Sequence, residues 1–584
     1  GLAYDFLDHF TIESRYQFNY SEVHNTSFLP SGLNFGDGKV FNNLGDSQYF
    51  VNDSFFRDYT FDNFLTYKNT FGDDHNLTAL LGMSVFKTTG EFYNFTGRGI
   101  VSPTYEGASL EGAAELIDAR DVNGANEFDQ RLLSYFTRVQ YNYKQRYLFS
   151  AVLRRDGSSN FGPRNKFGYF PSASLGWVVS DEAFYGTSDV LDFLKLRASY
   201  GILGNDRIGA FGYVSTLNAE GTYVFNNELV YGVAAGQLSN PEIKWERQKT
   251  FDVGFDARLF NSAIDLTVDY FKRRTDDLLL IPQVSGILGV SAPGAGAPIV
   301  NAGSVENSGL EFSLSYSKSF NDDAGFNLSY NFTTLKNEVI AVGNESGFIP
   351  GGSFGFGQEA PARMEAGFPI GHFYGLQTNG IFQSQDEVDA HATQTDATLG
   401  DLRYVDQNGD GVINGDDRVN LGDPIPDVTM GLNIGFNYKN FDFTAYAFAS
   451  IGNDIIRAYD RNQNLTNKTN YVLDRWTGAG STNSFPRVTT GPNSNLLFSD
   501  FYVEDGSYLR LQNVQLGYSL GNEVLDQLGI RKLRFYLAVS NLFTLTEYNG
   551  YDPSASSGAP IGGGIDQGFY PVPRVYTAGM NFKF

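Results

Sequence analysis

Residues 251–270 read FDVGFDARLFNSAIDLTVDY. Apolar and polar side chains alternate up to Leu259, and after Asn261 and Ser262 the alternation resumes at Ile264. A period of two places successive side chains on opposite faces of a β-strand, and a short gap between two such runs is typical of a hairpin. This stretch therefore predicts two antiparallel strands with one apolar face and one polar face.

The same alternation recurs along the whole chain. It is clear at residues 10–20, 310–317, 432–443, 533–540 and 576–584. We count about 16 to 18 such segments, many of them ~9–11 residues long, which is the length of a tilted membrane crossing. A soluble β-sandwich would show the same alternation. Two features favour a barrel over a sandwich: short turns alternate with long polar connections, and aromatic residues crowd the segment ends. The predicted fold class is therefore all-β, a transmembrane antiparallel β-barrel.

The composition agrees with this fold class and excludes several functions. The 584 residues include 65 glycines and are 15% aromatic, and a disordered chain would not hold so many aromatic residues. The net charge of −24 argues against nucleic acid as a partner. The chain has no cysteine, so it has neither disulfides nor thiol sites. We find no catalytic constellation or nucleotide-binding loop, and we therefore expect a protein that is not an enzyme.

One motif, at residues 406–417, has the spacing of a calcium-binding loop. The predicted ligands are the side chains of Asp406, Asn408, Asp410 and Asp417 and the main-chain carbonyl of Val412. Gly411 would supply the tight turn and Ile413 the apolar anchor. The last position holds Asp rather than Glu, which shortens the reach of that ligand. We predict a structural calcium site within an extracellular loop, residues 383–427, and the alternative is a polar surface turn.

Several longer segments carry a family resemblance. In chain order, these segments are RYLFSAVLRRDGSSNFGPRNKFGYFPSASLGW (146–177), LKLRASYGILGN (194–205), NPEIKWERQKTFDVGFD (240–256), NAGSVENSGLEF (301–312), GDLRYVDQNGDGVINGDDR (400–418), LDRWTGAGSTNSFPR (473–487), EDGSYLRLQNVQLGY (504–518) and YPVPRVYTAGMNFKF (570–584). Together they strongly resemble the SusC/RagA family of TonB-dependent outer-membrane transporters of Bacteroidota, and the resemblance covers nearly the whole chain.

The resemblance implies a barrel of about 22 strands whose lumen is closed by an N-terminal plug region. It also implies these partners: a SusD-like surface lipoprotein that acts as a lid, the TonB–ExbB–ExbD complex, outer-membrane lipid, and a second SusC–SusD pair in a dimer of dimers. We expect residues 1–584 to be the C-terminal part of such a barrel, with most but not all of its strands, and the plug to lie outside this chain.

The expected function is active import of oligosaccharides or peptides through the outer membrane, energised by TonB. No organic cofactor is expected. The sequence does not identify the residues that bind the substrate. Two alternatives stay open at this point: a passive porin-like barrel, and a surface binding protein that uses the barrel as an anchor.

Overall fold

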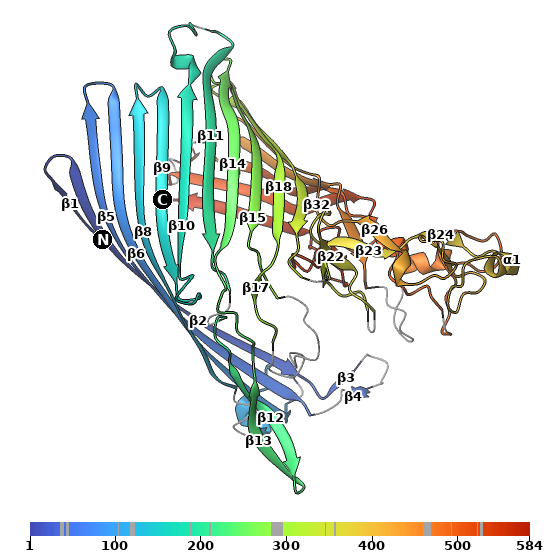
Figure 1. The fold of residues 1–584 in the computed structure, drawn as a ribbon. Helices are drawn as coiled ribbons and strands as arrows, with labels where there is room; N and C mark the ends of the chain where they lie inside the picture. The colour runs from blue at the N-terminus through green and yellow to red at the C-terminus, as the bar shows by residue number, and fades with distance from the viewer. Residues whose placement is uncertain are drawn as a thin grey trace. The chain divides into compact units, whose positions relative to one another are not determined.

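The computed structural model is almost entirely β-structure (Figure 1). It describes residues 1–34, 40–42, 46–102, 104–116, 123–186, 188–208, 212–281, 296–344, 346–355, 358–459, 469–491, 493–521, 524–525 and 530–584. The chain divides into two compact units. Unit 1 comprises residues 1–174, 201–247 and 284–300, and unit 2 comprises residues 175–200, 248–283 and 301–584.

The main sheet contains nineteen strands among the described residues. In unit 1 these are β1 (Leu2–Phe6), β2 (Phe10–Leu29), β5 (Gln48–Phe71), β6 (His75–Ile100), β7 (Ala113–Leu116), β8 (Asn123–Tyr143) and β9 (Tyr147–Ser158). In unit 2 they are β15 (Ile264–Asp276), β18 (Ser304–Asn321), β19 (Ala324–Thr334), β20 (Lys336–Ala341), β27 (Val428–Tyr438), β28 (Phe441–Ile451), β31 (Tyr508–Ser519), β32 (Lys532–Thr546) and β34 (Val575–Lys583). Residues of both units occur in β10 (Phe167–Val178), β11 (Leu191–Asn205) and β14 (Glu246–Leu259).

Strands that follow one another in the sequence are neighbours in the sheet. In unit 1 the antiparallel order is β1, β2, β5, β6, β8, β9. In unit 2 it is β15, β18, β19, β27, β28, β31, β32, β34. The short strand β7 pairs with part of β6, and the short strand β20 pairs with part of β18. The prediction of an antiparallel all-β fold is confirmed, and the long strands agree with the expected number of segments.

The hairpin of residues 251–270 forms as predicted, by β14 and β15. Its turn spans residues 260–263, so it is two residues longer than the gap that the sequence indicated. Phe260, Asn261 and Ser262 all have φ of +57°, a left-handed conformation that side chains other than glycine rarely adopt. Three such residues in succession reverse the chain within a few residues, so the two strands can pair along their length.

The strand register separates two faces of the sheet. In unit 1, one row of directly opposed residues is Ile12, Leu65, Leu81, Thr137 and Leu153. In unit 2, an equivalent row is Leu266, Leu314, Tyr330, Leu432 and Ala447. We call the face with these rows the apolar face. Its side chains lie in the open, as in the 61% exposure of Leu81, which is expected of a surface that contacts lipid.

The opposite face, which we call the polar face, carries charges and hydrogen-bonding groups. In unit 1, one of its rows is Glu13, Phe64, Gly82, Phe136 and Arg154. In unit 2, one of its rows is Asp265, Ser315, Ser329, Asn433 and Tyr446. Apolar and polar residues alternate along each strand, so strands that pair in register form a sheet with two chemically distinct faces.

Smaller elements lie in the connections. They are the pairs β3 (Gly32–Asn34) with β4 (Val40–Asn42), β12 (Leu217–Phe225) with β13 (Glu228–Ala235), β16 (Leu279–Leu280) with β17 (Val300–Asn301) and β24 (Thr378–Ile381) with β25 (Leu402–Tyr404); the sheet of β21 (Phe348–Gly351), β22 (Ala362–Glu365), β23 (His372–Leu376) and β26 (Arg418–Gly422); the sheet of β29 (Asp454–Arg457), β30 (Val503–Asp505) and β33 (Ile565–Asp566); and the helix α1 (Gln385–Asp389). No helix in the described part of the chain is long and apolar enough to cross a membrane.

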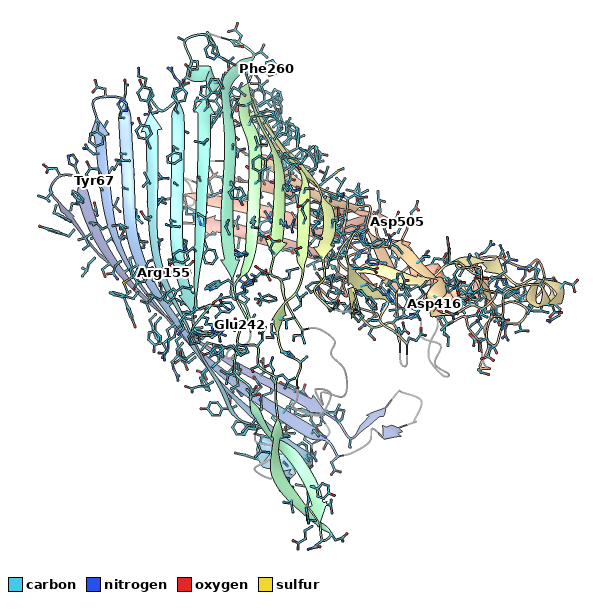
Figure 2. The ribbon with its side chains drawn as sticks, viewed as in Figure 1. Tyr67, Arg155, Glu242, Phe260, Asp416 and Asp505 are labelled. Atoms are coloured by element: carbon cyan, nitrogen blue, oxygen red, sulfur yellow. The ribbon has the colours of Figure 1, made fainter. Side chains whose placement is uncertain are left out.

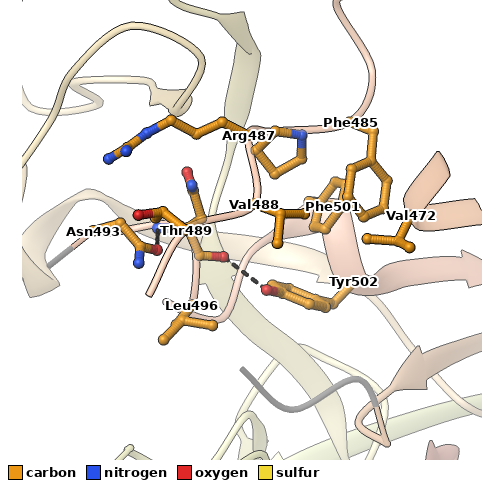
Figure 3. A pocket seen from close by; sticks show the side chains of 11 residues that line it. Val472, Phe485, Arg487, Val488, Thr489, Asn493, Leu496, Phe501 and Tyr502 are labelled. Carbon is orange, nitrogen blue, oxygen red and sulfur yellow. Dashed lines mark hydrogen bonds between the residues drawn. The ribbon is translucent and has the colours of Figure 1, made fainter. Parts of the chain in front are cut away.

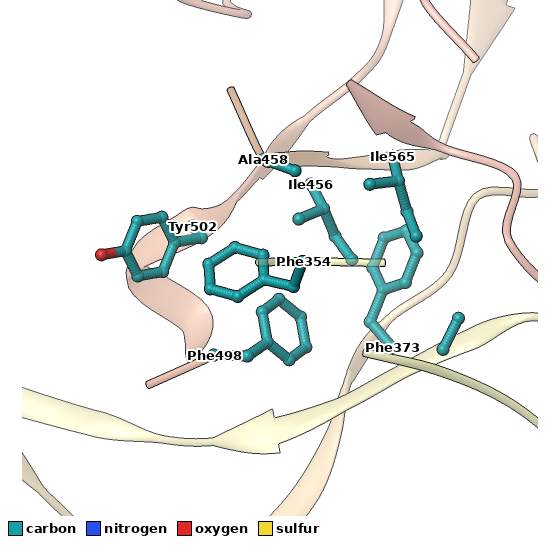
Figure 4. Close-up of a cluster of buried hydrophobic side chains, with 8 residues drawn as sticks. Phe354, Phe373, Ile456, Ala458, Phe498, Tyr502 and Ile565 are labelled. Atoms are coloured by element: carbon teal, nitrogen blue, oxygen red, sulfur yellow. The ribbon is translucent and has the colours of Figure 1, made fainter. Parts of the chain in front are cut away.

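Three long connections of unit 2 fold together into a structure with its own hydrophobic core. We call it the loop assembly; it comprises the described residues of 342–427, 452–507 and 547–574. Its central cluster is drawn in Figure 4 and consists of Phe354, Ala362, Phe373, Ile456, Ala458, Phe498, Tyr502 and Ile565. Each connection contributes apolar residues to this cluster. The expected polar loop 383–427 is therefore part of a packed structure, and it contains α1, β25 and β26.

Buried ion pairs link the first connection to the second and lie within the second. Asp401, which is fully buried, accepts two hydrogen bonds from Arg487 at 2.7 and 3.1 Å and one from Asn495 at 2.8 Å. Elsewhere Arg457 lies 3.1 Å from Glu504. Such pairs are costly to break, because removal of one partner leaves an uncompensated charge in the interior.

A group of carboxylates lies at the base of the loop assembly. Asp454 accepts a hydrogen bond from the N–H of Asp423 at 3.1 Å, and its surroundings include Asp505 and Asp427. Burial raises the pKa of Asp454 to about 6, and the neighbouring negative charges add to this effect. Asp454 therefore keeps its proton to a higher pH in the folded protein than an ordinary aspartate does.

We expect Arg487→Met to loosen the loop assembly. The substitution leaves the buried Asp401 carboxylate without its cation, a change that costs about 3–5 kcal/mol in comparable pairs. Trypsin should cut the loop assembly of the purified full-length protein much faster in this variant. The control is Arg164→Met, since the ion pair of Arg164 with Glu242 is exposed and worth about 0–1 kcal/mol. Equal digestion of the two variants would contradict the assignment.

The raised pKa of Asp454 predicts a pH dependence. A carboxyl whose pKa is about 6 in the folded state and 3.8 in its reference state stabilises the fold most below pH 4, and this contribution is lost as the pH rises through 6. Asp454→Asn should therefore stabilise the loop assembly at pH 7.5 by about 1 kcal/mol after solvent screening, with little effect at pH 4. Proteolysis rates at the two pH values measure this, with the exposed Asp416→Asn as control. A stabilisation of the same size at both pH values would disprove the titration of Asp454.

Candidate functional site

The predicted cation loop, residues 406–417, lies in the loop assembly between β25 and β26. Its first carboxylate bends back onto the backbone of the loop. Asp406 accepts hydrogen bonds from the N–H groups of Gly409 at 2.8 Å and Gly411 at 2.9 Å. Gly409 and Gly411 have φ of +74° and +83°, which favours glycine at both positions. The tight turn that the sequence predicts is therefore present.

The last predicted ligand, Asp417, closes the loop from the other end. Its buried carboxylate accepts hydrogen bonds from the N–H groups of Gln407 at 2.9 Å and Asn414 at 2.8 Å. Burial acts to raise the pKa of Asp417, but hydrogen bonds from Asn414, Gln407 and Asn408 outweigh it and lower the pKa. Asp417 is therefore held ionised, and it pins both ends of the turn.

The middle of the loop is anchored in apolar surroundings. Ile413 is 8% exposed and packs with Leu376, Ile381, Leu402 and Tyr404. Its N–H donates to the carbonyl of Thr393 at 3.0 Å. Ile413 is therefore buried among apolar side chains, as expected of the apolar position of the motif.

The remaining predicted side-chain ligands accept hydrogen bonds from nearby N–H groups of the loop. Asp410 accepts a hydrogen bond from the N–H of Val412 at 2.8 Å, and Asn408 accepts one from the N–H of Asp410 at 2.9 Å. Across the described residues, no three acidic or histidine side chains gather closely enough to hold a metal ion. The loop thus has the predicted turn and anchor, while its carboxylates are satisfied by the backbone N–H groups of the loop.

The polar face of unit 1 contains a basic groove of about 390 Å³. Arg15, Arg138 and Arg154 line it, together with Glu13. Arg15 donates to Glu13 at 2.5 Å, and the guanidinium of Arg154 lies over the ring of Phe136. A surface with three guanidinium groups and one carboxylate can bind anionic or hydrogen-bonding groups of a ligand or of a protein segment.

The polar face of unit 2 differs, because it is mostly uncharged. Ser315 lies 3.4 Å from Ser329, and Ser317 donates to Asn327 at 2.9 Å. Hydroxyl and amide groups form and release hydrogen bonds without the strong hold of a fixed charge. Such a wall suits the passage of polar solutes.

A small cavity of about 60 Å³ lies within the loop assembly (Figure 3). Phe485, Phe501 and Tyr502 form its aromatic wall, and Thr489 and Asn493 lie on its polar side. The Tyr502 hydroxyl is already committed, because it donates to the carbonyl of Asn495 at 2.7 Å. The cavity has room for only a few water molecules, so it is too small to be a substrate site.

Sequence reasoning missed the residues that hold the loop assembly together. Asp401 lies 86 residues from Arg487 and 94 residues from Asn495, so no local spacing relates it to them. Asp401 and Arg487 fall within two of the segments that carry the family resemblance. That is the only signal that could have indicated them. The basic groove was missed for the same reason, because its residues come from different strands.

Comparison with known proteins places this geometry in a family. A family model described as TonB dependent receptor-like, beta-barrel matches residues 1–542. The chain is 32% identical to TonB-dependent receptor P3 of Formosa agariphila, over 100% of this chain and 57% of that receptor. It is also 32% identical to TonB-dependent receptor SusC of Bacteroides thetaiotaomicron, over 78% of this chain and 44% of SusC. The chain thus spans about half the length of these curated relatives.

A solved structure agrees in fold. The structure of the RagAB peptide transporter matches with a TM-score of 0.81 at 22% sequence identity, over 100% of this chain and 61% of that one. At this level of identity the likeness shows the fold alone. Because the family match covers most of the chain and the fold agrees with it, the chain belongs to the TonB-dependent receptor-like β-barrel family of the outer membrane, and within that family it resembles SusC and RagA.

Proposed function

We propose that the full-length protein is an outer-membrane importer of oligosaccharides or peptides, energised by TonB and covered by a SusD-like surface lipoprotein. The observation that carries the proposal is the contrast between the two faces of the unit 2 strands. Their apolar face suits lipid, while rows of serine, threonine and asparagine form the other face. A barrel with such an inner wall offers hydrogen bonds to polar solutes along its length.

The loop assembly supports a role in handling substrate at the outer surface. It joins the ends of β20, β27, β28, β31, β32 and β34 in unit 2. Its hydrophobic core and buried ion pairs give it a fixed shape, which a polar connection without a core would lack. A fixed surface at the strand ends is suited to meet a lid or to present side chains to an arriving solute.

Both substrate classes have support. Tyr551 and Tyr570 in the loop assembly are 67% and 89% exposed, and tyrosine rings can stack on sugar faces or on peptide side chains. RagAB, whose solved structure shares this fold, is a peptide transporter. A plug region and the TonB–ExbB–ExbD complex complete the proposed machine, because a wide barrel would leak if its lumen were open.

Uptake measurements in the native bacterium test the proposal. Deletion of the full-length gene should abolish uptake of one labelled pool, either mixed oligosaccharides or mixed peptides, and loss of TonB should do the same. A gene copy with an intact loop assembly should restore uptake. Uptake that persists without TonB would instead indicate a passive porin. Surface binding of the labelled pool without any uptake would indicate an anchored binding protein.

We also propose that residues 406–417 hold a structural calcium ion. The order of oxygen-bearing residues, the two glycine turns and the buried Ile413 support it. Asp406, Asn408, Asp410, Asp417 and the Val412 carbonyl would supply the ligands. The ion would offset the repulsion among three acidic side chains and stiffen the segment between β25 and β26.

Trypsin offers a direct test, because Arg403 and Arg418 flank the loop. Calcium at millimolar concentration should slow cleavage at these sites in the wild-type protein. Asp410→Asn should weaken this protection at least tenfold in calcium concentration, since it removes one anionic ligand. Asp416→Asn is the matched control: it lies in the same loop, is exposed and is not a predicted ligand. If calcium does not change wild-type cleavage, the loop is only a polar turn.

A further inference from the structure

We propose that a groove on the apolar face of unit 1 binds an anionic membrane lipid, with an acyl chain in the groove and the phosphate group of the lipid against Arg155. The proposal rests on the placement of the chain in the outer membrane and does not depend on the import function. Arg155 lies on β9 and is labelled in Figure 2.

The groove has a volume of about 550 Å³ and an almost wholly apolar lining. It crosses β2, β5, β6, β8, β9 and β10, and its sides are formed by Ile12, Leu65, Leu81, Thr137 and Leu153. These residues are one row of the apolar face. A hollow of this size and chemistry, on a surface that contacts lipid, is suited to an acyl chain.

Arg155 is a charged residue on the apolar face. Its register partner on β8 is Tyr135, which is followed on the neighbouring strands by Met83 and Asn63. All four lie on the same side of the sheet as Leu81, and all four line the groove. A guanidinium on the lipid-facing side of a barrel is destabilising, most of all at the membrane midplane.

Two other cations on the same side of the sheet in unit 1 have carboxylate partners. Arg131 donates to Asp129 at 2.7 Å, and Arg57 donates to Glu91 at 2.6 Å. In contrast, no carboxylate pairs with Arg155 in the described chain, and its buried Nε has no hydrogen-bond partner there. Arg155 therefore has donors available for an anion that the protein itself does not supply.

The surroundings of Arg155 hold it in position. Its guanidinium stacks on the ring of Phe167 at 3.8 Å and lies 6.0 Å from the ring of Tyr169. Gly157 leaves the space for this stack, because a Cβ there would collide with Phe167. Tyr135 and Tyr169 are 42% and 61% exposed, so their hydroxyls are accessible beside the guanidinium.

These features select the class of lipid. A guanidinium forms paired hydrogen bonds with phosphate oxygens, and an aromatic stack leaves its edge free to do so. The groove accounts for the hydrocarbon part of the ligand, and tyrosine is typical of the boundary where lipid head groups begin. A lipid that carries a phosphate beside its acyl chains satisfies the whole site, whereas free phosphate would leave the groove empty.

Native mass spectrometry of the full-length protein in a non-ionic detergent tests the proposal. After incubation with equal amounts of phosphatidylglycerol and phosphatidylcholine, the wild-type protein should retain phosphatidylglycerol at least fivefold better. Arg155→Gln should lose this preference, and Arg155→Lys should keep part of it. The matched control is Arg131→Gln, which removes a cation from the same side of the sheet but leaves Arg155 intact.

A second variant separates the groove from the charge. Thr137→Trp fills the groove without changing any charge, and it should reduce retention of phosphatidylglycerol at least fivefold. Excess inorganic phosphate should not displace the bound lipid. Equal retention of the two lipids by the wild-type protein would overturn the proposal. So would unchanged retention in Arg155→Gln or in Thr137→Trp, or displacement of the lipid by inorganic phosphate.

Discussion

The backbone of a membrane-spanning sheet must satisfy its own hydrogen bonds, because lipid offers none. The architecture of the main sheet depends on that constraint. It requires strands that pair along their length. Because side chains alternate along each strand, the paired strands form a sheet with two different faces. The apolar face and the polar face of both units follow from the same register, and each has a task. One contacts lipid, and the other contacts water and solutes.

The loop assembly obeys a different physical rule. Outside the sheet, water satisfies exposed backbone groups, so the connections need no particular fold to be stable there. They fold because each brings apolar residues, such as Phe373 and Ile456, that are buried in one shared cluster. Burial then allows charges inside, and the pair of Asp401 with Arg487 fixes two connections at one point. The result is a shaped surface with a pH-sensitive carboxyl, Asp454, at its base.

The two proposed ligand sites in the structure differ in how they are built. The loop at 406–417 is local: its turn, anchor and proposed ligands come from one short segment, so spacing alone indicated it. The groove beside Arg155 is not local. Its lining comes from six strands, and its role depends on which side of the sheet Arg155 occupies. A single substitution of Leu153 would alter the groove, although Leu153 carries no signal of its own in the sequence.

The elements with local causes could be predicted from the residues alone. Alternation indicated the strands and their faces, turn residues indicated the hairpins, and the spacing of oxygen-bearing residues with Gly411 indicated the turn at 406–417. Which distant residues meet became known only from the folded chain: the partner of Asp401, the cluster around Phe354, and the absence of a carboxylate beside Arg155 in the described chain. The physical reason is that strand periodicity follows from backbone geometry within a few residues, whereas burial and charge pairing are properties of residues brought together from several connections.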